Sequence, residues 1–146
     1  MEDRIKIQEI QPAAWKAMYG LAAYLGTTEL TKKQLGLIMI RASQINGCAF
    51  CINMHTSDAL KDGETMQRIF LLNAWKETDK FTEEEKVLLA MTEEITLISQ
   101  QGLTAATYSK ATQYFSNEKI AQIIMAIVTI NGWNRIAIST EMPVGE

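Results

Sequence analysis

Both cysteines and the only histidine of this 146-residue chain lie within one short stretch, QINGCAFCINMH, residues 44–55. Cys48 and Cys51 are three positions apart, and His55 follows Cys51 by four. On an α-helix, residues separated by three, four or seven positions project from nearly the same face. The spacing therefore groups two thiols with an imidazole, a set that suits thiol redox chemistry or metal binding.

The residues before Cys48 favour the redox interpretation. Asn46-Gly47 is a turn signal, so we expect Cys48 to begin a new helix. Free backbone N–H groups and the helix dipole stabilise a thiolate at a helix start, and two cysteines three apart can close a disulfide there. His55 can accept or relay a thiol proton near neutral pH. One thiolate would attack a peroxide or a disulfide, and the second cysteine would resolve the product.

Two alternatives stay open at this point. Zinc accepts Cys and His ligands, but a structural site wants four, and only a carboxylate or water could complete the set here. We therefore expect no metal. The other alternative is a pair of small apolar cysteines and a histidine that is merely buried in the core.

Helix signals divide most of the chain, and strand signals are almost absent. Pro12 can open a helix that runs to about Leu25, and Gly26 can end it. Thr31 and Gln34 form a capping box for the next helix. Two further helices are expected over 48–62, with Gly63 as the stop, and over 65–76. The next should begin at the Thr82–Glu85 capping box, carry Ile98 and end before Gly102. Thr104 and Ser116 are the expected caps of the last two helices, the second of which should reach about Ser139. The pattern predicts an all-α protein.

Two segments of the chain resemble each other: LGLIMIRASQINGCAFCI, residues 35–52, and IAQIIMAIVTINGWNRIA, residues 120–137. Each places an apolar helix directly before Ile-Asn-Gly. The similarity indicates a helix-turn-helix duplication whose second copy has lost its chemistry, with Trp133 at the position of Cys48. Chance similarity between two apolar helices is the alternative.

Composition limits the class of protein. The length suits a single domain over residues 1–146. A formal charge of −3 with dispersed basic residues argues against nucleic-acid binding. No apolar run approaches the roughly 20 residues that span a bilayer, and the first ten residues lack the apolar region of a signal peptide. We therefore expect no membrane partner and a cytoplasmic location, where a close cysteine pair is typical of redox or metal chemistry.

The stretch RASQINGCAFCINMHTSDALKDGE closely resembles the carboxymuconolactone decarboxylase-like superfamily, in particular its alkyl hydroperoxidase D-like (AhpD-like) branch. The similarity extends to QPAAWKAM before it, and to AWKETDKFTEEEKVLLAMTEEIT and TINGWNRIAI after it, so nearly the whole chain is covered. The resemblance implies an all-α, AhpD-like bundle of about six to eight helices, assembly into homo-oligomers such as trimers or hexamers, and thiol peroxidase chemistry without a cofactor.

Site residues follow from that resemblance position by position. Cys51 matches the cysteine that reacts with peroxide, Cys48 its resolving partner, and His55 the histidine of a proton relay. The family relay also uses a Glu twelve residues before the first cysteine, where this chain has Gly36. Glu93 matches a Glu that recurs in this branch and is our predicted substitute; a solvated carboxylate on an acidic helix is the alternative. Glu85 is better explained as a capping residue.

These observations predict a peroxidase that reduces organic hydroperoxides and is recharged by an external thiol or disulfide-reductase donor. Lactone decarboxylation is the enzymatic alternative, although decarboxylases of the superfamily do not depend on this Cys and His set. A redox-responsive assembly or binding module without efficient turnover is the alternative outside enzymes. Trp133, Asn134 and Arg135 could line a pocket if the two similar segments pack together; otherwise Trp133 belongs to the core and Arg135 to a structural pair. The abundance of apolar residues also predicts an oligomer.

Overall fold

The computed structural model of the protein describes residues 3–145, and within them every regular element is a helix. The prediction of an all-α fold is confirmed. The elements are α1 (Ile7–Ile10), α2 (Pro12–Leu25), α3 (Lys32–Asn46), α4 (Ala49–Lys61), α5 (Met66–Leu71), the 3-10 helix η1 (Leu72–Glu77), α6 (Glu83–Thr96), α7 (Ala105–Tyr114) and α8 (Asn117–Ser139).

The helix starts lie where local hydrogen-bonding signals put them. The side-chain oxygens of Thr31 and Thr82 each accept from the backbone N–H three residues on, and Gln34 and Glu85 accept from the cap N–H groups in return. Both predicted capping boxes are therefore confirmed. The caps at 104 and 116 are confirmed as well, by the same bond to the third residue of the helix.

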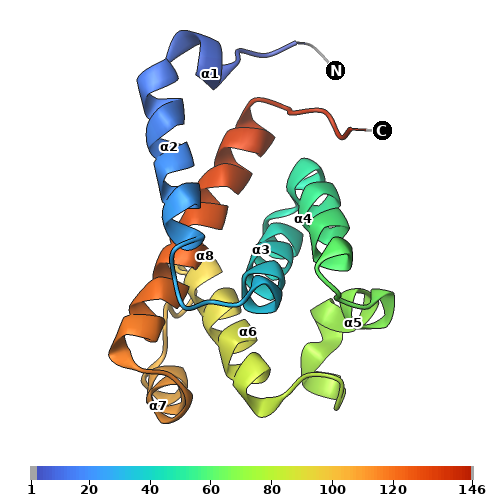
Figure 1. Ribbon diagram of the computed structural model, residues 1–146, viewed down its shortest axis with the longest axis vertical. Coiled ribbons are helices and arrows are strands. Elements are labelled where there is room, and N and C mark those ends of the chain that lie inside the picture. The colour runs from blue at the N-terminus through green and yellow to red at the C-terminus, as the bar shows by residue number, and fades with distance from the viewer. Residues whose placement is uncertain (1–2, 146) are drawn as a thin grey trace.

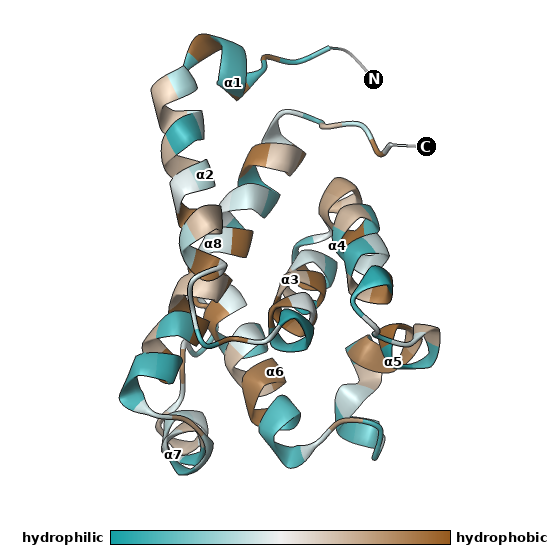
Figure 2. Ribbon diagram, viewed as in Figure 1, coloured by the Kyte–Doolittle hydropathy of each residue, from teal (hydrophilic) through white to brown (hydrophobic). Residues whose placement is uncertain are grey.

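Helix α3 is the centre of the fold, because it packs against α4, α6 and α8 at once (Figure 1). In Figure 2 the apolar residues of these helices gather on the sides that face one another. Several large side chains there have no solvent exposure: Ile38, Ile40, Leu89, Met91, Ile123, Ile127 and Ile130. Each such side chain contributes about 1.5 to 3 kcal/mol through its burial, so α3, α6 and α8 form a rigid base for the shorter helices around them.

Helix α2 lies along the C-terminal half of α8, and the short helix α1 packs against α2 at its far end (Figure 1). Both chain ends lie at the same end of the molecule. There the guanidinium of Arg4 contacts Glu141 at 2.8 Å and donates to the carbonyl of Ser139 at 3.0 Å. Because α2 has few other neighbours, its position depends mainly on α8.

The segment 65–76 is not the single helix that its pattern predicts. It divides into α5 and η1, with a non-helical residue at Ala74. Leu72 and Trp75 are both buried, and a 3-10 segment with three residues per turn can turn both inward. The helix that begins at Glu83 also ends earlier than expected, at Thr96 rather than just before Gly102.

Arg68 holds this part of the chain in place. Its guanidinium pairs with Glu64 and Glu85, donates to the carbonyl of Lys80 at 2.8 Å and lies 4.7 Å from the centre of the Phe81 ring. Burial tends to raise the pKa of Glu85, but the hydrogen bonds from Arg68 and Thr82 outweigh it and hold that pKa below its ordinary value. Glu85 therefore has a structural role besides its role in the cap.

The second Ile-Asn-Gly does not make a turn. Helix α8 continues through Asn131 and Gly132 to Ser139, whereas Gly47 in the first copy has φ +71° and ends α3. The prediction of a helix-turn-helix duplication is therefore wrong, because the second segment lies within one uninterrupted helix. The two segments do pack against each other, as α3 against α8. Of the helices that the structure describes, none combines the length and the apolar character that a membrane crossing would require.

Candidate active site

The turn at Asn46-Gly47 places both cysteines. With Gly47 in the left-handed conformation, the backbone N–H of Cys48 donates to the carbonyl of Ser43 at 3.0 Å and closes the end of α3. Cys48 is then the N-cap of α4, and its sulfur accepts from the backbone N–H of Cys51 at 3.3 Å. The sulfur of Cys48 therefore lies where free N–H groups stabilise a thiolate.

Cys48 and Cys51 are joined by a disulfide, with their Cα atoms 5.3 Å apart. Both residues are buried, with 1% and 2% of their surface exposed. The Cα separation is within the usual range for a disulfide, so the start of α4 accommodates the bond without moving the backbone. The site shown is thus the oxidised form of a Cys-x-x-Cys pair.

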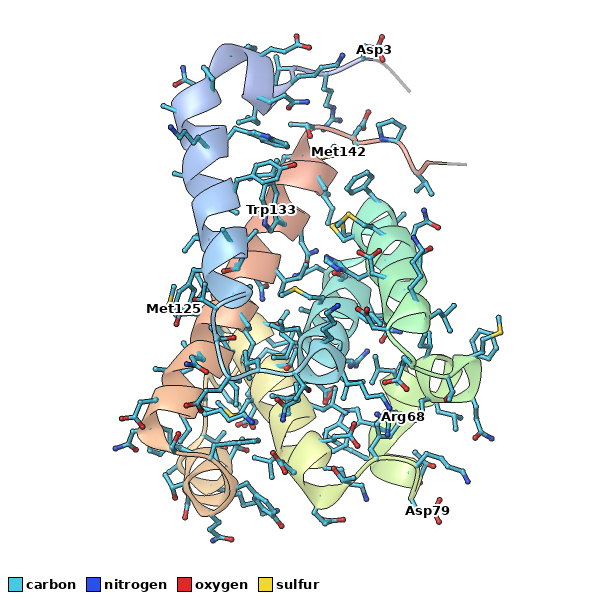
Figure 3. The ribbon with its side chains drawn as sticks, viewed as in Figure 1. Asp3, Arg68, Asp79, Met125, Trp133 and Met142 are labelled. Atoms are coloured by element: carbon cyan, nitrogen blue, oxygen red, sulfur yellow. A yellow bond between two sulfur atoms is a disulfide. The ribbon has the colours of Figure 1, made fainter. Side chains whose placement is uncertain are left out.

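Cys51 lines an apolar cavity of about 270 Å³, and Cys48 does not. The walls come from α2, α4, α8 and the segment after α8, and the lining residues are Trp15, Tyr19, Ala22, Phe50, Cys51, Met54, His55, Trp133, Ala137 and Met142. Figure 3 shows Trp133 pointing from α8 towards α2, with the disulfide in yellow beside the start of α4. Cys51 and His55 therefore border the same space.

Three aromatic rings shape one wall of the cavity. The ring centres of Trp15 and Trp133 are 5.2 Å apart in an edge-to-face arrangement, and Tyr19 lies 5.6 Å from Trp133. Such pairs are stabilised beyond their buried area by the ring quadrupoles. This wall of the cavity is therefore aromatic and carries no charged side chain.

His55 is half-buried and borders two cavities. Besides the apolar cavity it lines a second space of about 360 Å³, which is bounded by α2, α3, α4 and α8. Burial lowers the pKa of His55 below its ordinary value of 6.5, and the negative charge of Asp58 opposes part of that shift. This shift favours the neutral imidazole, the form of the ring that can accept a proton.

A buried amide network fixes the turn before Cys48. The side-chain NH2 of Asn46 donates to Asn131 at 3.0 Å and to Asn134 at 2.9 Å, and Asn134 in turn donates to the hydroxyl of Ser43 at 3.0 Å. Asn134 has no exposed surface. Since Ser43 also accepts the N–H of Cys48 on its carbonyl, α8 holds both ends of the turn that presents the cysteines.

Comparison with known proteins agrees with this fold. The family model of the carboxymuconolactone decarboxylase family matches residues 12–94, which include the cysteine pair and His55. The chain belongs to the carboxymuconolactone decarboxylase family. Its structure is similar to that of a protein of unknown function from Agrobacterium tumefaciens, named as a candidate antioxidant defence protein AhpD, at a TM-score of 0.95 and 36% identity over 99% of both chains.

Two further relatives are similar to this member of the family. The uncharacterised protein YdfG of Bacillus subtilis (strain 168) is 42% identical over 139 residues, which are 95% of each chain. An uncharacterized peroxidase-related protein of Ralstonia eutropha JMP134, named as an alkylhydroperoxidase AhpD core, shares the fold at a TM-score of 0.83 and 15% identity, over 95% of this chain and 74% of that one. The predicted AhpD-like helical bundle is thereby confirmed.

The structure brings together three of the four predicted site residues: Cys48, Cys51 and His55 all belong to α4 or its cap. Glu93 lies elsewhere. Its carboxylate accepts from the guanidinium of Arg41 at 3.0 and 3.1 Å, is 3.7 Å from the ammonium of Lys76, and lines a cavity without Cys51 or His55. A catalytic role for Glu93 stays a prediction, whereas its pairing with Arg41 is a structural interaction between α3 and α6.

Two of the residues discussed around the predicted relay, Gly36 and Trp133, line the cavities beside His55. Gly36 lines the second cavity together with His55, although it has no side chain to offer. Trp133 lines both cavities, and Arg135 lies outside them, where it donates to Asn131. Among residues 3–145, no three Cys, His, Asp or Glu side chains are grouped closely enough to hold a metal ion.

Sequence reasoning missed the contributions of α2 and of the acidic residues after His55. Trp15 and Tyr19 are four apart, which is the spacing of one helix face, but only tertiary packing shows that this face meets Cys51. Asp58 carries a clearer signal, because it follows His55 by three residues on the same helix. The role of Asn46 had no signal beyond its place in the turn.

Proposed function

We propose that this protein is a thiol-dependent peroxidase, in which the Cys48–Cys51 pair reduces organic hydroperoxides. The observation that carries the proposal is the shared apolar cavity, in which Cys51 and His55 face the same space while Cys51 is bonded to Cys48. A nucleophile, a base and a resolving thiol are thus contributed by a single helix start.

The oxidative half of the cycle begins with both cysteines reduced. His55 takes the proton of the Cys51 thiol, and the thiolate attacks the terminal oxygen of the hydroperoxide. The O–O bond breaks, the alkoxide takes the proton from His55 and leaves as an alcohol, and Cys51 becomes a sulfenic acid. Cys48 then attacks the sulfur of Cys51, so that the disulfide forms and one water is released.

The reductive half needs two electrons and two protons from an external thiol donor. The donor thiolate attacks the sulfur of Cys51, since Cys51 and not Cys48 lines the cavity. Cys48 leaves as a thiolate at the N-cap, where the N–H of Cys51 stabilises it. A second donor thiol releases Cys51, and the donor ends as a disulfide. A reducing compartment such as the cytoplasm would supply this donor.

The cavity favours a hydroperoxide with an uncharged, apolar body. Its lining residues include three large aromatic rings besides Phe50 and two methionines, and neither Lys nor Arg. Such walls gain free energy from the burial of an alkyl or aryl group, whereas hydrogen peroxide offers them nothing to bury. The same lining speaks against lactone decarboxylation, because a carboxylate-bearing lactone would find no cation to pair with.

The test is a single-turnover oxidation. The reduced protein is mixed with one equivalent of cumene hydroperoxide, quenched with an alkylating reagent, and weighed by mass spectrometry. We expect both thiols of the wild type to be lost together within seconds. The matched variant Cys48→Ser should stop at a sulfenic acid on Cys51 that dimedone traps, and Cys51→Ser should trap nothing.

Two outcomes would change the assignment. If both wild-type thiols can still be alkylated after an hour with the peroxide, the peroxidase proposal is wrong. If the pair is oxidised once but dithiothreitol and excess peroxide give no sustained turnover, the protein is a redox-responsive module instead of an enzyme.

We also propose that the protein works as a homo-oligomer. Large apolar side chains are exposed on several elements, among them Phe70 at 70% and Ile98 at 62%. A groove between α6 and α8 adds Val128, which is 46% exposed. Light scattering should give a multiple of 16.4 kDa, and a monomeric mass at micromolar concentration would contradict the proposal.

A further inference from the structure

The second cavity gives His55 an acidic neighbourhood that the peroxidase cycle above does not use. Two carboxylates line it, those of Asp58 and Asp62, together with Gly36 from α3. Among residues 3–145, only His55, Ala22 and Trp133 border both this space and the apolar cavity. His55 can therefore contact substrate from one space and a carboxylate from the other.

The two carboxylates of this cavity differ in their partners. Asp62 lies 3.6 Å from the ammonium of Lys32 and is thus partly neutralised. Asp58 makes no ion pair with any residue in the described part of the chain. Asp58 also follows His55 by three positions on α4, so the two side chains are neighbours on one helix face.

We propose that Asp58 is the positioning carboxylate of His55, and that it stabilises the imidazolium while the proton of Cys51 is held on the ring. This inference rests on the thiol redox function proposed above. Asp58 touches neither substrate nor sulfur in this arrangement, and acts only through His55. Gly36 on α3 has no side chain that could place a negative charge beside the ring, and Asp58 supplies this charge from α4 instead.

The charge balance around the ring supports this role. His55 is neutral before it takes the Cys51 proton and positive afterwards, and a positive charge in a half-buried site needs a nearby anion. Burial lowers the pKa of His55, and the charge of Asp58 raises it again in part. The other charged groups of the cavity are Asp62 and Lys32, while α2 and α8 contribute only uncharged residues.

A carboxylate introduced at Gly36 can test whether His55 needs a nearby negative charge or needs Asp58 itself. A Cβ atom at Gly36 would lie 3.6 Å from the Cβ of Ala59, an ordinary van der Waals contact, and the residue has no positive φ. A glutamate side chain at this position can extend into the 360 Å³ cavity that His55 lines. Gly36→Glu should therefore provide a second carboxylate from α3 without displacing the backbone.

The decisive measurement is the titration of His55 by proton NMR, which is unambiguous because the chain has one histidine. Asp58→Asn should lower the pKa of His55, since the imidazolium loses its nearest anion. Asp62→Asn, at the C-cap of the same helix and in the same cavity, is the matched control and should shift the titration less. In the double variant Gly36→Glu with Asp58→Asn, the pKa should rise again. Equal titrations in wild type and Asp58→Asn would overturn the inference.

A kinetic arm links this titration to chemistry. Asp58→Asn should slow the oxidation of Cys51 by cumene hydroperoxide about threefold to tenfold, with the acidic limb of the rate profile moved to lower pH; Gly36→Glu should restore part of the rate. A slower rate with an unmoved acidic limb would mean a structural role only and would overturn the proposal.

The alkylation rate of the reduced pair by iodoacetamide, measured against pH, separates this inference from the peroxidase assignment. If the wild type ignores hydroperoxides, the proposed function fails. The role of Asp58 still stands in that case if Asp58→Asn shifts both the NMR titration and the alkylation profile, and it falls if neither moves.

Discussion

The two copies of Ile-Asn-Gly, at residues 45–47 and 130–132, have the same letters and opposite structures. Gly47 turns into the left-handed region and ends α3, so that Cys48 can cap α4. Gly132 stays inside α8, where a Cβ atom would lie 3.1 Å from the methyl carbon of Met18. The first glycine is needed for its conformation, whereas the second lies against the flexible end of the Met18 side chain on α2, which can move aside.

The difference between the copies divides the work of the site. The first of the two similar segments, residues 35–52, holds the Cys48–Cys51 disulfide at the start of α4. The second copy supplies the support, because Asn131 and Asn134 bond to Asn46 and the ring of Trp133 closes the cavity. The contrast indicates that an Asn-Gly pair ends a helix where the residues after it are more stable in a new helix than in a continuation of the old one. After Gly132, the burial of Asn134 and Ala137 stabilises the continued helix instead.

The largest effect is expected from a change in the first copy that leaves the second intact. Cys51→Ser should reduce hydroperoxide turnover about a thousandfold or more, because it removes the proposed nucleophile. Steady-state peroxide consumption with dithiothreitol measures this loss, and the urea midpoint of the reduced proteins serves as the control for folding. Retained turnover would show that the chemistry does not depend on the first copy.

A change in the second segment should lower the stability of the protein and leave the oxidation of the cysteines possible. Asn134→Leu removes two hydrogen bonds of the amide network, one of them buried and one partly buried, and should lower the free energy of unfolding by about 2 kcal/mol. The redox pair itself remains, so single-turnover oxidation of the cysteines should still occur. Urea unfolding of the reduced protein measures the first effect. An unchanged midpoint would mean that the amide network does not support the turn.

The two glycines give the most direct contrast between the copies. Gly47→Ala should cost about 1 to 2 kcal/mol, because an L side chain is strained at φ +71°. Gly132→Ala should change stability by less, since the Cβ meets only the flexible end of Met18 and alanine favours the helix. Thermal unfolding of the matched pair gives both values. A larger loss at Gly132 would reverse our explanation of the two glycines.

The smallest effect concerns the pH dependence of stability. Because the folded pKa of His55 is below its ordinary value of 6.5, the unfolded chain binds this proton first as the pH falls. The stabilising contribution is therefore complete above pH 6.5 and is lost as the pH falls towards the folded pKa. His55→Gln should unfold with a weaker pH dependence just below pH 6.5. An identical dependence in the variant would show that other groups cause it.

Much of the fold could be predicted because helix starts are local. Thr31, Thr82 and Ser116 bond to backbone groups three residues away, so a short stretch of sequence contains the whole interaction. The exceptions have distant causes. The segment 65–76 bends at Ala74 so that buried residues on both sides can face the core, which periodicity within the segment does not reveal.

For the site, the sequence by itself determined the group on α4: two thiols at a helix start and an imidazole on the same face, all set by spacings of three and four. Only the tertiary structure decided what this group faces. The cavity walls come from α2 and α8, far away along the chain, and Glu93 pairs with Arg41 across a helix interface. Such contacts depend on the packing of whole helices, which no local pattern of residues contains.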